Sequence, residues 1–468
     1  MFYDCIKLKN IELDGILTNI NSSKIESLRT MFYNCTEINN ITLENINFLE
    51  LNTMREFLLC VNKLNKVIFK NLFFSKSVAM DELIGFNLYN STIIFENINA
   101  PNINSLQNLF NSLYFNNIIF KNIYIPKVTT IQKLFANGRN ISNANISFEN
   151  IYAPNINNVQ NTFHKGRYNT IEFKNVNFEN LKSMKMMFGN TSLINLIFDN
   201  LTVPNVESLD NFFTGELNNI SFKNIDFFIL LTMNSLVPEK IRYFYFINMN
   251  ASKLITLEKL FYYYYYHLQY AIFENVDFSN VISMEKMFVC HYGNQYYDGL
   301  ISFKNINASN LYNMKYFIFG YYYRNVSLEN INFSNLTSLE KVFVGYTDYN
   351  SNCEINLINI NAPKVTSMNN IFWRNRFDYL KIKDLNIPNC LTMENLTFSG
   401  SLKGNLTLEN INANSLLSTK RMFENVEAEY IYFINFTSPN LEYTDYMFSN
   451  CQYLKYIKLE GIYIFKRN

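Results

Sequence analysis

The stretch Ile93–Phe110, IIFENINAPNINSLQNLF, contains every part of a unit that repeats along the chain. It begins with an apolar alternation at Ile93 and Phe95, which is the period of a strand with one covered face. It then reaches Asn97, turns at Pro101, and closes with a Ser-Leu-x-x-Leu-Phe segment. Variants of this stretch recur throughout the sequence, so we expect a repeat architecture.

The repeat has a period of about 25 residues, as the closing residues Phe110, Phe135 and Phe163 illustrate. This period lies within the range of leucine-rich repeats, about 20–29 residues, and is too short for repeats built of helix pairs. Strands one unit apart must be parallel, because a tight hairpin cannot join them. We therefore expect one domain over residues 1–468, a right-handed leucine-rich-repeat solenoid with one continuous parallel β-sheet.

The segment that closes each unit predicts the back of this solenoid. In Ser183-Met184-x-x-Met187-Phe188 the apolar residues have i, i+3, i+4 spacing, and the serine has the properties of a helix N-cap. Prolines such as Pro101 and Pro154 suit a return segment outside the sheet. We expect short helical or irregular segments on the back.

An asparagine recurs where each strand is expected to end. Its amide can donate to a carbonyl of one unit and accept from an N–H of the next, which would join neighbouring units. A metal or sugar site is the alternative, although such a site does not usually recur in every unit. The asparagines that form this predicted ladder include Asn97, Asn122, Asn150, Asn175, Asn200 and Asn224.

The residue before each of these asparagines alternates in charge, as in Glu96, Lys121, Glu149 and Lys174. Stacked parallel strands lie about 4.8 Å apart, so opposite charges would be neighbours and would favour one register. We therefore expect the outer face of the sheet to carry a charge ladder with a structural role. The apolar residues expected beside it are Ile68, Ile94, Ile119, Ile197 and Ile272.

Composition excludes several classes of function. The 468 residues are 48% hydrophobic, and the 40 basic and 39 acidic residues leave a net charge of +1. This balance argues against electrostatic binding to nucleic acid. No run of about 18 apolar residues indicates a membrane span. The seven cysteines are thinly spread, which argues against a disulfide framework.

The first residues, MFYDCIKLKN, lack the charged region, apolar run and cleavage site of a signal peptide. The sequence by itself therefore suggests a cytoplasmic chain. The array also begins in mid-unit without the polar cap that repeat proteins need. Whether Met1 is the true start stays open, and an extension before it would supply the missing cap.

Three segments share the pattern Met-Phe-x-x-Cys-x-x-apolar-x-x-Ile-x-Leu, namely Met1–Leu13, Met31–Leu43 and Met447–Leu459. Together with the asparagine pattern of Asn175–Phe188, they resemble the BspA-type leucine-rich-repeat family in its Met-Phe-x-x-Cys variant. The resemblance covers essentially the whole chain. It implies a binding or adhesion module at the cell surface or secreted, without catalytic residues.

Tyrosine-rich loops are the candidate partner-binding sites, because insertions in solenoids map to loops and exposed tyrosine is a favoured contact residue. Codon-driven low complexity is the alternative explanation. The candidates are Tyr262, Tyr263, Tyr264, Tyr265, Tyr266, Tyr296, Tyr297, Tyr321, Tyr322 and Tyr323.

No HExxH, GxSxG, GxGxxG or P-loop pattern occurs, and we expect neither cofactor nor metal. The sequence favours a non-enzymatic scaffold that binds a protein or a surface glycan, with no nucleic acid and no membrane span. A purely structural spacer without a specific ligand is the alternative, and an enzyme is the least favoured class.

Overall fold

The computed structural model is a parallel β-solenoid whose strands recur about every 25 residues. The chain divides into two compact units, Met1–Leu230 and Leu231–Asn468, and the single domain expected over residues 1–468 stays a prediction. The structure describes residues 2–12, 24–61, 63–84, 91–110, 115–135, 144–233, 236, 238, 240–262, 268–290, 299–320, 324–345, 353–397 and 401–463.

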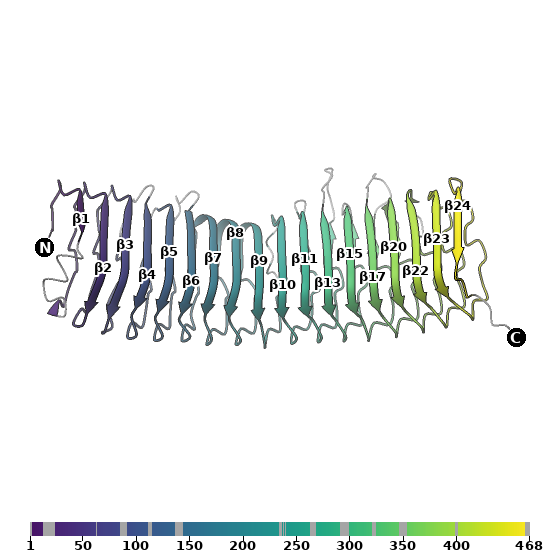
Figure 1. Ribbon diagram of the computed structural model, residues 1–468, viewed down its shortest axis with the longest axis horizontal. Coiled ribbons are helices and arrows are strands. Elements are labelled where there is room, and N and C mark those ends of the chain that lie inside the picture. The colour runs from purple at the N-terminus through teal and green to yellow at the C-terminus, as the bar shows by residue number, and fades with distance from the viewer. Residues whose placement is uncertain are drawn as a thin grey trace. The chain divides into compact units, whose positions relative to one another are not determined.

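The first unit consists of parallel strands joined by turns, and in Figure 1 they lie side by side and point the same way. Each strand pairs with the equivalent strand one repeat further along. We call one repeat, with its strand and its turns, a coil. The strands are β1 (Asn10–Glu12), β2 (Asn40–Phe48), β3 (Lys66–Phe74), β4 (Thr92–Asn99), β5 (Asn117–Tyr124), β6 (Ala144–Tyr152), β7 (Arg167–Asn177), β8 (Phe188–Thr202) and β9 (Phe213–Asp226).

The second unit repeats this arrangement with one long strand in each coil. These are β10 (Tyr243–Asn250), β11 (Tyr270–Asp277), β13 (Leu300–Asn307), β15 (Asn325–Asn332), β17 (Glu354–Asn361), β20 (Tyr379–Asn386), β22 (Asn405–Asn412), β23 (Tyr430–Thr437) and β24 (Tyr456–Glu460). Shorter strands form a second sheet, β12 (Phe288–Cys290), β14 (Ile318–Gly320), β16 (Phe343–Val344) and β18 (Phe372–Trp373), and a pair, β19 (Arg376–Phe377) and β21 (Ser401–Leu402).

Stacked apolar side chains fill the interior. In β4, Ile93, Phe95 and Ile98 are buried, and equivalent residues of the next coil lie in register with them. The Phe95 ring stacks on that of Phe120 at a centroid distance of 5.1 Å. Phe120 in turn stacks on Phe148 at 5.0 Å. Such pairs contribute about 0.5–1.5 kcal/mol beyond the burial of their area, so the stack supports the register.

Each recurrent asparagine is a left-handed residue within a strand, and not the strand end that we expected. Asn97 has φ of 55° and is skipped in the pairing of β4 with β5. The left-handed residue shifts the alternation by one position in every strand, so that Ile98 points inward and Asn97 is exposed. Asparagine tolerates the left-handed region better than most residues, which explains its recurrence.

Of the short helical or irregular segments expected on the back, the helical alternative is not found, because no α-helix occurs among the described residues. Met184, Met187 and Phe188 are buried as their spacing requires, but Met186 has φ of 54°, which interrupts any helix. The Met186 N–H donates to the Asn211 carbonyl of the next coil at 2.9 Å. The same apolar spacing is therefore satisfied by a chain of turns bonded from coil to coil.

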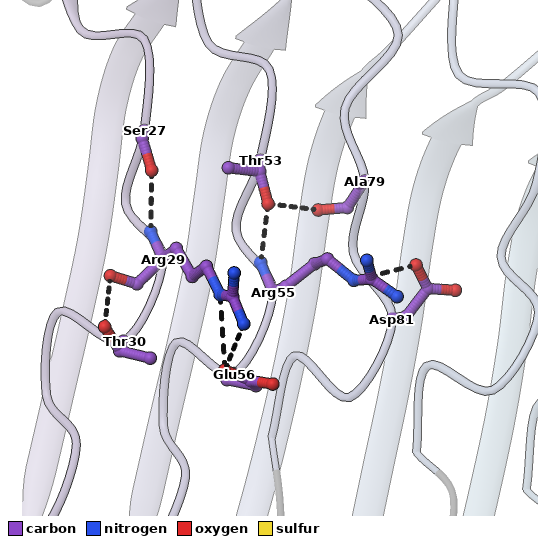
Figure 2. A network of polar contacts seen from close by, with 8 residues as sticks. All are labelled: Ser27, Arg29, Thr30, Thr53, Arg55, Glu56, Ala79 and Asp81. Atoms are coloured by element: carbon purple, nitrogen blue, oxygen red, sulfur yellow. Dashed lines mark hydrogen bonds and ion pairs between the residues drawn. The ribbon is translucent and has the colours of Figure 1, made fainter.

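Serine and threonine side chains shape these turns. The Ser27 hydroxyl accepts from the Arg29 N–H at 3.2 Å, and Thr53 accepts from Arg55 at the same distance (Figure 2). Exposed arginines then reach acids one coil further on, as in the Arg55–Asp81 pair at 3.3 Å. The serine expected to cap a helix therefore caps a turn.

Substitutions at Asn122 test the left-handed position. Asn122 has φ of 54°, donates to Asn97 at 2.8 Å and accepts from Asn150 at 2.9 Å. Valine should lower the melting temperature most. It loses the amide hydrogen bonds, and its left-handed backbone conformation costs about a further 1–2 kcal/mol. Glycine should lower it least, since it keeps the backbone, and alanine should lie between them.

Thermal melts followed by circular dichroism give this ranking. An N122V variant as stable as N122G would contradict the role assigned to the backbone at this position.

Candidate functional site

The charge ladder lies on the outer face of the first sheet. Glu96, Lys121, Glu149 and Lys174 are in register on neighbouring strands β4 to β7. The Lys121 ammonium lies 3.4 Å from the Glu149 carboxylate, and both side chains are partly exposed. Such pairs contribute about 0.2–1 kcal/mol each, which suits a role in setting register.

The asparagine ladder also lies on this face, but its amides bond to one another rather than to the backbone groups that we expected. Nδ2 of each residue donates to a side-chain oxygen of the preceding coil, at 2.8 Å from Asn97 to Asn71. The same contact joins Asn122, Asn150, Asn175 and Asn200 to their predecessors at 2.8–2.9 Å, and Asn224 instead donates to Asp199 at 2.7 Å. Each such amide therefore has a partner within the sheet.

Of the tyrosine-rich loops, only Tyr262 is described. Its ring centre lies 5.4 Å from the Lys259 ammonium, a cation–π distance. The other candidates lie outside the described residues: Tyr263, Tyr264, Tyr265, Tyr266, Tyr296, Tyr297, Tyr321, Tyr322 and Tyr323.

The first unit has a polar groove of about 710 Å³ beside the turns that follow β4 to β8. Several of its amides already have partners within the unit, since Asn180 donates to Asn155 at 2.8 Å and Asn155 to the Pro126 carbonyl at 2.7 Å. Ammonium and amide groups of this kind can bind hydroxyl or anionic ligands. The lining residues are Asn104, Lys127, Thr129, Asn155, Asn157, Asn180, Lys182 and Asn205.

The second unit carries an apolar stripe at the position occupied in the first unit by Asn104, Thr129, Asn157 and Lys182. We define the stripe by four residues, Leu231, Ile255, Ile282 and Tyr312, which are 42%, 44%, 37% and 56% exposed. Backbone bonds join them directly, from Ile255 to Leu231 at 3.3 Å, from Ile282 to Ile255 at 2.9 Å and from Tyr312 to Ile282 at 3.1 Å.

These four side chains are therefore neighbours on four successive coils. Exposed apolar groups that are contiguous, rather than scattered singly, mark interaction sites in soluble proteins.

Sequence reasoning missed both the groove and the stripe. We expected this part of each repeat to be helical or irregular, and in a helix Ile255 and Ile282 would have been ordinary members of an apolar face. A signal was nevertheless present, because the residue at this position is polar in the four successive coils of Asn104, Thr129, Asn157 and Lys182 and apolar from Leu231 to Tyr312.

Titratable side chains offer little reactive chemistry. Burial raises the pKa of the Cys390 thiol to about 12, so it stays protonated at neutral pH. Burial, and next Lys165, lower the pKa of His164, which keeps this imidazole neutral. Within the described ranges, no group of three His, Cys, Asp or Glu side chains could hold a metal ion.

A charge swap tests the ladder. Lys121→Glu should lower the melting temperature slightly, because it places like charges between Glu96 and Glu149. Adding Glu96→Lys and Glu149→Lys should recover part of the loss in thermal melts at low salt.

The matched control is Lys127→Glu, on the same coil but outside the ladder, for which the two added lysines should recover nothing. The absence of recovery in the Lys121 series would refute the ladder.

Comparisons with known proteins give one family. The model described as "Mycoplasma protein of unknown function, DUF285" matches residues 1–119, 104–224, 255–355 and 350–458. No curated protein and no solved structure matches the chain. In the part of the chain that the structure describes, no helix is long and apolar enough to cross a membrane.

Proposed function

The chain belongs to the DUF285 family, whose description states no function, and we propose that it is a non-enzymatic scaffold that binds a protein partner. The observation that carries the proposal is the apolar stripe Leu231, Ile255, Ile282 and Tyr312 of the second unit. A solenoid without a ligand has no need to expose adjacent apolar side chains, since four coils of the first unit have Asn104, Thr129, Asn157 and Lys182 at the same position. An apolar protein surface would remove the stripe from water.

The resemblance to BspA-type leucine-rich repeats supports an adhesive role, because it implies a surface or secreted binding module. We extend the proposal to the leucine-rich-repeat class on this resemblance. We extend it to the tyrosine-rich loops because insertions in solenoids map to loops and exposed tyrosine is a favoured contact residue. A surface glycan is a second candidate ligand, favoured by the hydroxyl-binding groups of the polar groove at Lys127, Asn155 and Lys182.

A purely structural spacer is the alternative from another class. The two ladders favour this alternative, because their groups interact with neighbouring coils. The amides of Asn97 and Asn122 donate to the preceding coil, and Lys121 forms an ion pair with the next coil. The stripe distinguishes the binding scaffold from the spacer. A scaffold would lose its partner when the stripe becomes polar, whereas a spacer would lose no interaction.

Replacing two stripe residues separates these readings. Ile255→Asn with Ile282→Asn should reduce capture of the specific partners about tenfold, which corresponds to about 1.4 kcal/mol. The measurement is quantitative mass spectrometry of proteins retained by the full chain from the source cells, with wild type and variant at equal loading.

The matched control is Leu49→Asn, which changes a leucine that is 41% exposed at another repeat position in the first unit and should leave capture unchanged. Melting temperatures of all proteins must agree, so that a loss of capture is not a loss of folding. Equal capture by wild type and double variant would favour the spacer.

Exchange of the segment Tyr262–Tyr266 for Ser and Gly tests the loop. If the loop contributes, the exchanged chain should retain fewer partners in the same capture, because tyrosine supplies large contact area. Identical capture of the same proteins would exclude the loop and leave the stripe as the contact surface.

A further inference from the structure

The polar groove of the first unit has hydrogen-bond donors that the fold does not use. Lys127 donates to Asn102 at 2.7 Å, which leaves two of the three N–H groups of its ammonium available. Among the described residues, neither the Lys182 ammonium nor the side-chain amide of Asn157 has a partner. These donors line the groove and can bind the acceptor oxygens of a ligand.

The groove is also positively charged. Its lining consists of lysine, asparagine and threonine side chains, without a carboxylate. Glu207 follows Lys182 in the next coil but lies outside this lining. Lys127 and Lys182 belong to coils two steps apart, which is about 10 Å along the stack. A ligand with anionic groups at a similar interval would therefore meet both ammonium groups.

An exposed aromatic pair stands at the strand ends that lead into the groove. Tyr124 and Tyr152 are in register on β5 and β6 and are 45% and 44% exposed. Their rings stack at a centroid distance of 5.3 Å. Tyr124 lies three residues before Lys127 of the groove lining, and Tyr152 lies three residues before Asn155 of that lining. The rings and the groove therefore belong to the same coils.

The aromatic pair interrupts a column of small polar residues. Asn99 and Asn177 are its neighbours in register on β4 and β7. The same repeat position holds Asn307, Asn332 and Asn361 in the second unit. Since the neighbours are asparagines, no ring of the column covers the outer face of either tyrosine. Such a face can pack against the C–H groups of a sugar ring, while the tyrosine hydroxyl can form hydrogen bonds.

We propose that the groove binds an acidic oligosaccharide, a sugar chain with a carboxylate on every second residue. Its carboxylates pair with Lys127 and Lys182. Its hydroxyl groups bind the amide of Asn157, and one of its rings packs against Tyr124 or Tyr152. The groove volume of about 710 Å³ lies within the usual range of ligand sites, about 300–1,000 Å³. This inference rests on the surface glycan that is the second candidate ligand above, and it names the class of that glycan.

Calorimetric titration of the full chain with a hyaluronan hexasaccharide, which carries a carboxylate on every second sugar, tests the site. Lys182→Gln should weaken binding about tenfold, because it removes a charged hydrogen-bond donor. The double variant Tyr124→Asn with Tyr152→Asn should weaken it about fivefold through the loss of ring contacts. Asparagine suits the fold because it is the native residue at this position in other coils, such as Asn99.

The matched control is Lys185→Gln, which removes the same charge from an exposed lysine of the same coil, outside the groove lining. This variant should bind with unchanged affinity, and the melting temperatures of all variants must agree with that of wild type. Wild-type affinity in Lys182→Gln or in the tyrosine double variant would overturn the proposal.

Two further probes separate this inference from the glycan candidate itself. Chitohexaose, a neutral chain of the same length, should bind at least about tenfold more weakly than the hyaluronan hexasaccharide. Equal affinity for the two would overturn the acidic class but keep a glycan in the groove, whereas binding of neither would exclude both. Tighter binding of an oligothymidylate would overturn the proposal in favour of nucleic acid. The stripe is in the second unit, so Ile255→Asn with Ile282→Asn should bind the hexasaccharide as wild type does.

Discussion

Hydrogen bonds from one coil to the next are the interaction on which the rest of the structure depends. These bonds join neighbouring strands of the sheet, and they also join neighbouring turns of the back. On the back, bridges such as Ser105 to Thr130 replace the internal bonds of a helix. The N–H and C=O groups of a coil point toward the neighbouring coils only if the chain turns sharply. Left-handed residues therefore occur both in the strand and in the back segment, as at Asn97 and Asn108. Every backbone group must be satisfied in this way, and each repeat therefore keeps the same form.

This constraint arranges the side chains in columns, because residues one coil apart are in register. A column can be structural, like the stacked rings of Phe95 and Phe120 or the amides of Asn97 and Asn122. Where the side chains of a column change from polar to apolar, the new side chains are not needed to join the coils and can serve a function. The stripe beginning at Leu231 is such a change, on the surface of the second unit.

Much of this could be predicted from the sequence, since the strand of Ile93 and Phe95 and the order of Glu96 and Lys121 follow directly from period-2 alternation and parallel stacking. The back could not, because the spacing of Met184, Met187 and Phe188 fits a helix and a left-handed turn equally well. In this coil only the backbone of Met186 decides between them, although asparagine, which favours a positive φ, occupies the same position in other coils as Asn108, Asn161 and Asn211. The exposure of the stripe depends on the turns of that back, so the apolar run from Leu231 to Tyr312 could not be recognised as a surface feature.

Spin-label distances within the first unit test the helix-free back most directly. In a chain without its native cysteines, labels at Thr42 and Glu172 probe the outer face, and labels at Arg55 and Lys185 probe the back over the same five coil steps. Both pairs should be separated by about 24 Å, since neighbouring coils are about 4.8 Å apart on either face. A back distance of about 40–50 Å, as helices packed 8–10 Å apart would give, would contradict the structure.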